Sequence, residues 1–381
     1  MSSIAALYVH IPFCHSICPF CAFAVHQHRA DLRQGYMDAL RQEIAQVSAE
    51  HAASVDIASI YVGGGTPSTL SGDEVAALMR TLRGAFSVRA DAEVALELNP
   101  EDATAKYLAA LRKAGVTRIS LGIQSLDDAT LRALGRTHTA EQARAALDAT
   151  KTSEIRNVNA DLMFGAPGMS GEAFRRDVDA MIERRLPHLS LYGLDVEEGT
   201  PFGRDAKVRT WAADHRELQA ELYLWAHDRL TAAGYRHYEV SNFCLPGHEG
   251  RQNLLVWSGE GYLGLGQGAH SYVAGARWHN ARHLREYERE ISAGRLPIAF
   301  HEQLSPAQQA NESLMLALRQ DTGLDIPVWE RQHQLAWGVS RQRIAEQLAR
   351  TGHADYDGAR LRLTAAGLLV ADEITEQLMV G

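Results

Sequence analysis

The sequence of 381 residues has little cysteine, little excess positive charge and no long apolar run. Four cysteines, three of them in one loop, are no disulfide framework, so a reducing cytoplasmic location is expected. A net charge of −9 argues against a nucleic-acid phosphate backbone as the main partner. No apolar run approaches the roughly 20 residues of a membrane span. The opening stretch MSSIAALYVHIPFC is also too short for a signal peptide.

Hydrophobic residues make up 46% of the chain and charged residues 22%, so a sizeable core can be buried. Six short apolar runs alternate with helical patterns, at 7–11, 57–62, 94–98, 118–123, 158–163 and 188–194. Runs that are apolar on both faces and alternate with helices predict a parallel sheet covered by helices. Because no G-x-G-x-x-G fingerprint occurs, a dinucleotide fold is disfavoured. The pattern predicts an α/β fold, a partial (β/α)6 barrel.

The chain divides into three predicted segments. The barrel is expected over 1–240, with a long helix over 211–233 near its end. A Gly-rich and aromatic connecting segment covers 241–304. Over 305–381 the chain turns helical, beginning with Pro306 at a first helical position, and ends in a short strand and another helix. This last part predicts a small helical, winged-helix-like C-terminal domain.

Three of the four cysteines stand together in the loop after the first predicted strand. Cys14, Cys18 and Cys21 have the spacing C-x3-C-x2-C, which lets one tight loop turn three thiolates toward a single point. Three thiolates are one fewer than the four that close an ordinary Fe–S or zinc site. A [4Fe–4S] cluster held here therefore keeps one iron open to an outside ligand. On spacing alone, a zinc knuckle or three unrelated core cysteines remain alternatives.

Polar residues and glycines fall at the ends of the other predicted strands, where barrels hold their chemistry. The run GGGTP at 63–67 presents a backbone whose amides and carbonyls can reach a small ligand. Glu97, Gln124 and Asp161 fall at or near the ends of the next strands. We expect these groups and Cys14 to converge on one mouth of the barrel.

Six motifs together resemble the coproporphyrinogen-oxidase-like branch of the radical S-adenosylmethionine (SAM) superfamily, from Tyr8 to the C-terminus. They read HIPFC, GGGTPS, LELNPE, RISLGIQS, DLMFGAPG and LYGLDVEEGTPF. The resemblance implies a radical SAM barrel whose three cysteines hold a [4Fe–4S] cluster. The open iron would be chelated by the amino and carboxylate groups of SAM, and an electron donor would serve the cluster.

The same resemblance implies a set of cofactor-binding residues: Tyr8, Phe20, Gly64, Gly65, Thr66, Glu97, Gln124, Arg136 and Asp161. Their chemistry is consistent with SAM. Glu97 or Asp161 can accept hydrogen bonds from ribose hydroxyls or an amino group, and Arg136 can pair with a carboxylate. Alternatives stay open for two of them. Arg136 could be an exposed charge at a helix end, and Tyr8 a half-buried strand aromatic.

Two classes within this branch compete. One is the oxygen-independent coproporphyrinogen III oxidase, and the other is the HemW-type haem chaperone, which binds haem and hands it to acceptor proteins. Six residues before Leu7, the segment Ala22–Phe23, and the runs YEVSNF and YLGLGQGAHSY favour the chaperone. A radical SAM methyltransferase on the same scaffold is a third alternative.

One departure bears on the haem. The chaperones carry a His-Asn-x-x-Tyr-Trp signature whose His is a proposed haem ligand, whereas this chain reads QNLLVW, with Gln252 in place of that His. Gln is a poor ligand for haem iron. The resemblance makes the connecting segment 241–304 a possible haem region. We expect a substitute ligand within 243–270, and the candidates are Cys244, His248 and His270. Cys244 is otherwise expected to be a buried free thiol, and His270 a hydrogen-bonded structural histidine.

Overall fold

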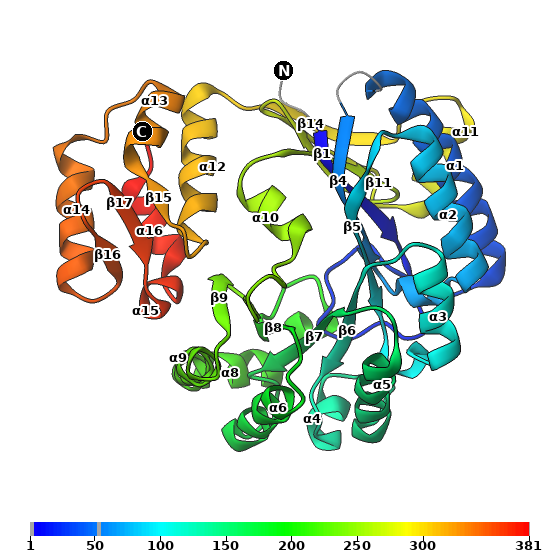
Figure 1. The fold of residues 1–381 in the computed structure, drawn as a ribbon, viewed down its shortest axis with the longest axis horizontal. Coiled ribbons are helices and arrows are strands. Elements are labelled where there is room, and N and C mark those ends of the chain that lie inside the picture. Colours follow the sequence, from blue (N-terminus) through cyan, green and yellow to red (C-terminus); the bar gives the residue numbers. More distant parts are fainter. Residues whose placement is uncertain (1–3, 52–54, 381) are drawn as a thin grey trace.

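A computed structural model describes residues 4–51 and 55–380. Its centre is a parallel sheet of six strands: β1 (Ile4–Ile11), β4 (Val55–Gly64), β5 (Val88–Leu98), β6 (Arg118–Gln124), β7 (Asn157–Phe164) and β8 (His188–Gly193). The strands follow chain order, curve into an open arc and confirm the predicted partial barrel (Figure 1).

Helices pack on the outside of the arc (Figure 1). They are α1 (Ala30–His51), α2 (Gly72–Ala85), α3 (Ala105–Lys113), α4 (Asp128–Ala133), α5 (Ala140–Thr152) and α6 (Gly171–Glu183), with short turns η2 (Pro67–Thr69) and η3 (Pro100–Asp102). Two of them begin at capping boxes. Ser71 pairs with Glu74 at α2, and Thr139 pairs with Gln142 at α5.

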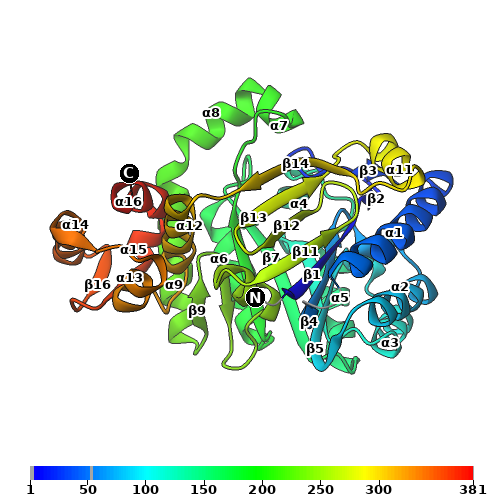
Figure 2. The same ribbon diagram turned by 90° about the horizontal axis from the view of Figure 1, so that it is seen from above.

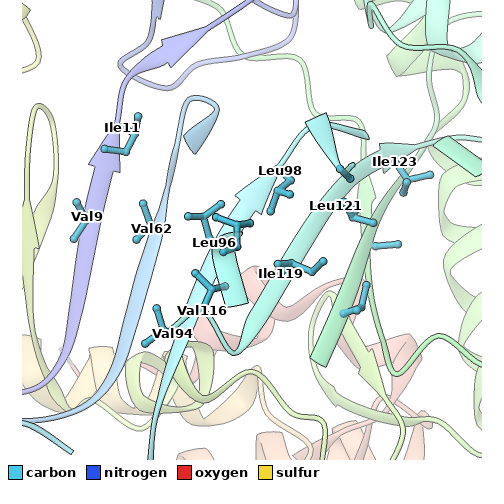
Figure 3. Packing of buried hydrophobic residues seen from close by; sticks show 14 of the residues in the cluster. Val9, Ile11, Val62, Val94, Leu96, Leu98, Val116, Ile119, Leu121 and Ile123 are labelled. Atoms are coloured by element: carbon cyan, nitrogen blue, oxygen red, sulfur yellow. The ribbon is translucent and has the colours of Figure 1, made fainter. Parts of the chain in front are cut away.

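The core consists of buried apolar side chains that stand along the parallel strands (Figure 3) together with helix residues such as Leu40 of α1. Val9, Val62 and Ile119 are fully buried, and Leu96 is almost so. Each such side chain stabilises the fold by roughly 1.5–3 kcal/mol relative to an exposed position. Because this apolar face packs on the helices, the opposite, concave face of the sheet is left for polar side chains.

The region predicted as one long helix over 211–233 is two helices, so this expectation was wrong. After α7 (Pro201–Arg204), α8 (Ala206–Asp214) ends at His215 and α9 (Arg216–Ala232) follows. The ring of His215 stacks on Trp211 at 3.6 Å and its Nδ1 lies 2.8 Å from the Trp211 carbonyl oxygen. The helical backbone is therefore interrupted at His215, between α8 and α9.

Residues 241–304 form more than a connection. After β9 (Arg236–Glu239), β10 (Asn242–Cys244) pairs antiparallel with β8, and α10 (Arg251–Trp257) lies inside the arc (Figure 1). β11 (Gly261–Leu265) then pairs parallel with β1 at the other edge, followed by β12 (His270–Val273), β13 (Ala276–Asn280), α11 (Leu284–Ser292) and β14 (Ile298–Gln303). The single twelve-stranded sheet therefore ends in antiparallel strands on both sides.

We call residues 241–304 the extension. A buried carboxyl group connects the extension to α1. Glu43 of α1 accepts hydrogen bonds from the backbone N–H of Gly266, from Asn280 Nδ2 and from the Tyr287 hydroxyl. Burial raises the pKa of Glu43 to about 7, although these donors oppose the shift. The extension is thus fixed to the barrel by polar as well as apolar contacts.

The C-terminal part has its own apolar core around Leu314, Trp329 and Leu361. Its elements are α12 (Pro306–Leu318), β15 (Leu324–Asp325), α13 (Ile326–His333), α14 (Gly338–Arg350), β16 (Ala354–Tyr356), β17 (Arg360–Leu363), α15 (Ala365–Leu368) and α16 (Ala371–Leu378). The order β15-β17-β16 gives the small wing that the sequence predicts. Among the helices of the described ranges, none combines the length and apolarity needed to cross a membrane.

Candidate functional site

A cavity of about 370 Å³ opens at the C-terminal ends of the parallel strands. It is lined by eleven of the twelve residues predicted from the sequence: Cys14, Cys18, Phe20, Cys21, Gly64, Gly65, Thr66, Glu97, Gln124, Arg136 and Asp161. Residues far apart in the chain meet here because parallel strands bring their ends to one edge of a sheet. We call this space the cofactor cavity.

The cysteine loop is held in place by backbone pairing. Two-residue strands β2 (Phe13–Cys14) and β3 (His26–Gln27) pair in parallel, and the N–H of Cys21 donates to the Cys18 carbonyl at 3.1 Å. His10 of β1 adds a side-chain anchor, because its Nε2 lies 2.9 Å from the carbonyl oxygen of Ala24. Both ends of the loop are therefore fixed to the first strand.

The three thiols lie in an environment that disfavours free thiolates. Burial raises the pKa of Cys14 to about 11; a hydrogen bond with Thr66 opposes the shift, and the neighbouring Cys18 and Cys21 add to it. The pKa of Cys21 is also raised, chiefly by burial. A cationic iron centre would offset both effects, since metal binding displaces thiol protons.

The glycines after β4 serve close packing. Gly64 has φ +108°, and a side chain there would meet the His10 ring at 2.3 Å. A side chain at Gly65 would meet the backbone of 11–13 at 2.8 Å. Gly64 N–H donates to Glu97, Gly65 N–H to Ile11 and Thr66 N–H to Phe13. These three amides are thus used within the protein, which corrects the expectation that they reach a ligand.

Two partly buried carboxyl groups lie on the cavity wall. Glu97 accepts from the Tyr61 hydroxyl at 2.7 Å and from Gly64 N–H at 3.1 Å. Burial raises the pKa of Glu97 to about 7, and the charge of Asp161 contributes to the rise. Asp161 accepts from Asn159 Nδ2 at 2.8 Å, and burial raises its pKa as well. Both keep oxygen lone pairs that can accept from a ligand.

Arg136 lies on the wall and is not the exposed helix-end charge that the sequence also allows. Its Nη1 lies 3.4 Å from Cys18 Sγ, and its Nη2 donates to Asn99 Oδ1 at 2.8 Å. Its buried Nε has no hydrogen-bond partner among the described residues, and neither has Oε1 of Gln124. Gln124 also has φ +62°, which is uncommon outside glycine. Unpaired groups and a strained residue indicate a wall shaped for a ligand.

Tyr8 lies beside the cavity and not on its wall. Its hydroxyl lies 3.0 Å from His10 Nδ1, and its ring stacks on Tyr61 with centroids 6.3 Å apart. Burial raises its pKa, with Glu97 adding to the effect. Tyr8 is not among the residues that line the cavity, so its role in binding SAM stays a prediction.

The sequence analysis did not assign ten of the residues that line the cavity, and Asn99 and Met163 are two of them. Asn99 follows β5 and fixes Arg136, and Met163 lies two residues after Asp161 on β7. The signal was present, because alternate residues of a strand share a face. A polar residue directly after Leu98 and an apolar one beside Asp161 could both have been assigned to the mouth.

Gln252, which stands where the haem signature has its His, does not line the cofactor cavity. Gln252 on α10 is buried, its Oε1 has no partner among the described residues, and it borders a polar cavity of about 90 Å³ with Asn159 and His188. Small-molecule sites usually measure about 300 Å³ or more. This cavity is thus too small for a haem.

The substitute ligands named from the sequence differ in access. Cys244 is a fully buried free thiol, as predicted, and burial raises its pKa to about 12. His248 is bonded through Nδ1 to Asn157 Oδ1 at 2.7 Å. His270 is exposed, and its ring has no hydrogen bond among the described residues, so the expected hydrogen-bonded structural role was wrong. His270 lies on β12, the third strand from the β14 edge of the sheet, and its side chain is accessible there.

The residues present fit a [4Fe–4S] cluster with SAM. The donor set of three thiols shares one cavity with partly buried carboxyls and with unpaired polar atoms of Arg136 and Gln124. Within 4–51 and 55–380, no three His, Cys, Asp or Glu side chains are gathered closely enough to hold a single metal ion.

Comparison with known proteins agrees with this site. Residues 8–181 match the model of the radical SAM superfamily, and residues 304–370 match the HemN C-terminal domain. The structure of coproporphyrinogen III oxidase (HemN) from Escherichia coli superposes with a TM-score of 0.83 at 23% identity, over 100% of this chain and 91% of that one. Fold and site together define a radical SAM protein with a HemN-type C-terminal domain.

Curated relatives narrow the class. The chain is 36% identical over 376 residues to "Heme chaperone HemW" of Mycobacterium tuberculosis, covering 98% of this chain and 94% of that protein. It is 30% identical to the protein of the same name from Bacillus subtilis, over 96% and 97% of the two chains. The chain belongs to the HemW family.

Proposed function

We propose that this protein is a haem chaperone that carries a [4Fe–4S] cluster and SAM, binds haem and hands it to acceptor proteins. One observation carries the proposal: relatives named heme chaperones match the chain over almost its full length. Free thiols that hold such a cluster require a reducing compartment, so we place the protein in the cytoplasm.

In the cofactor cavity, Cys14, Cys18 and Cys21 would hold the cluster. When bound, the cluster supplies an open iron for SAM and accepts an electron from a donor protein. Glu97 and Asp161 lie where they can accept hydrogen bonds from SAM's hydroxyl or amino groups, and Arg136 places a fixed positive charge beside Cys18. That charge also favours the thiolate form of the cysteines.

A coproporphyrinogen III oxidase is the second candidate, and the likeness in fold to HemN favours it. The chaperone requires stable haem binding and release. The oxidase requires SAM consumption coupled to decarboxylation of coproporphyrinogen III.

The test is anaerobic reconstitution with iron and sulfide, followed by three parallel assays of one preparation. We expect haem binding near one per chain, a SAM-dependent change in the reduced EPR signal and no conversion of coproporphyrinogen. Conversion of coproporphyrinogen with SAM consumption and without haem binding would establish the oxidase instead.

A further inference from the structure

Beyond β1, which carries Tyr8, the sheet continues onto β11 and β12 (Figure 2). Tyr8 lies opposite Gly264 of β11, and Tyr262, two residues earlier, lies opposite Tyr272 of β12. Opposed residues share a face, and each strand returns to that face at every second residue. The face that carries Tyr8 therefore includes His270, two residues before Tyr272.

A tight hairpin brings a second histidine to the same place. Ala274 and Gly275 have φ values of +52° and +81°, as a two-residue turn of this twist requires. His270 and His279 are equally distant from that turn and lie directly opposite each other, with ring centroids 4.9 Å apart. Phe300 of β14 opposes His279 and stacks on it at 5.5 Å. We call His270, His279 and Phe300 the histidine face.

The ring of His279 is held in the form that ligates a metal. Its Nδ1 lies 3.0 Å from the carbonyl oxygen of Asn280. Because a carbonyl only accepts, the tautomer of a neutral ring that fits this contact carries its proton on Nδ1 and keeps its lone pair on Nε2. Metal-binding histidines are commonly oriented by such a second hydrogen bond. His270 beside it is exposed, and Phe300 is 46% exposed, so the face is open to a ligand.

Charges around the face favour neutral imidazole and an anionic ligand. Partial burial lowers the pKa of His270, and the charges of His279, Arg282 and Arg277 lower it further. Arg282 is exposed and donates from Nη2 to the carbonyl oxygen of Ala22, next to Cys21. Ion pairs of Arg282 are absent from the described part of the chain. A positive charge thus lies between the histidine face and the cysteine loop.

We propose that haem binds at the histidine face, with its iron on Nε2 of His279 and with His270 as the neighbouring imidazole that can take its place. Neutral imidazole is a preferred haem ligand, Phe300 supplies an aromatic surface for the porphyrin, and Arg282 can pair with a propionate. This inference rests on the proposed function, for which it names the binding residues. The open face leaves one side of the haem accessible to an acceptor protein.

The test is a haemin titration of the full chain, followed by the Soret absorbance, with matched variants. His279→Ala should weaken haem binding by roughly tenfold and shift the Soret band, and the double variant with His270→Ala by roughly a hundredfold. The control is His301→Ala. His301 is also exposed on this ribbon, but it opposes Trp278 on the other face of the sheet. The His301→Ala variant should bind haem with the affinity of the unaltered chain.

Two failures are distinguishable. If the unaltered chain binds no haem, the proposed function fails and this inference with it. If the unaltered chain binds haem and the double variant binds it with the same affinity and spectrum, the inference is overturned while the function stands. Equal losses of haem affinity in His301→Ala and His279→Ala would also overturn the inference, since both substitutions would then act by disturbing the fold of strands β12–β14.

Discussion

The cofactor cavity and the histidine face share one concave surface but differ in burial. The cavity places Glu97 and Asp161 in the interior and fixes its cysteine loop by backbone pairing. The histidine face lies on β12, β13 and the edge strand β14, with His270 and Phe300 exposed. An enclosed, preorganised wall suits a resident cofactor, whereas an open face suits a ligand that has to leave. One sheet can therefore retain a cofactor in an enclosed cavity and present a second ligand for release on an open face.

The largest expected effect breaks the enclosed site. Cys14→Ser, Cys18→Ser and Cys21→Ser should each abolish the [4Fe–4S] cluster, because the loop supplies no spare thiol. Iron content and the reduced EPR signal measure this. Cys244→Ser is the matched control, and cluster loss in that variant would overturn the three-cysteine assignment.

The second effect is the pH dependence of stability. It compares Glu97 of the cavity with Glu43, which connects α1 to the extension. Glu97 and Glu43 each have a pKa raised from 4.5 to about 7 in the folded protein. Their folded forms favour the proton, so this stability is complete below pH 4.5 and is lost as pH rises through about 7. Each carboxyl should cost about 3 kcal/mol of unfolding free energy across that window.

Denaturant titrations of the cluster-free protein at pH 5 and pH 8.5 measure that loss. Glu97→Ala should remove about half of the pH dependence and leave the part due to Glu43. A pH dependence unchanged in Glu97→Ala would show that the partly buried carboxyl of the cavity is not protonated in the folded protein.

The third effect sharpens the role of the wall. Glu97→Ala should weaken SAM binding by roughly tenfold, since a hydrogen bond to a charged group is worth about 1.5–3 kcal/mol. The cluster itself should remain, because Glu97 is no thiol ligand. Calorimetric titration of the reconstituted protein gives the dissociation constant, and an unchanged value would remove Glu97 from the SAM site.

The smallest effect separates α10 from the histidine face. From the sequence, restoring the signature with Gln252→His is expected to tighten haem binding or shift the Soret band. The burial of Gln252 beside a cavity of about 90 Å³ changes that expectation to no shift and a dissociation constant within about twofold. A tighter, shifted haem complex would place the haem at α10 instead.

The sequence predicted the parallel part of the molecule well. Apolar runs, capping residues such as Ser71 and strand-end polar residues are local signals, and parallel topology then brings the strand ends together. Eleven predicted residues accordingly share the cofactor cavity. Tyr8 lies off its wall because a strand pattern fixes a face but not which neighbour covers the side chain.

The antiparallel extension could not be assembled in the same way. Pairing of β11 with β1 joins residues more than 250 positions apart, and nothing in either segment specifies that partner. His279 was therefore missed, although the Ala274–Gly275 turn signal and the equal spacing to His270 were present in the sequence. A hairpin assignment would have paired the two histidines.

Haem titration of the cluster- and SAM-loaded protein tests the separation of the two sites most directly. We predict that one haem binds per chain while the iron–sulfur EPR signal and the SAM dissociation constant stay unchanged. Loss of the cluster signal or displacement of SAM as haem binds would place haem in the cofactor cavity and contradict a separate open face.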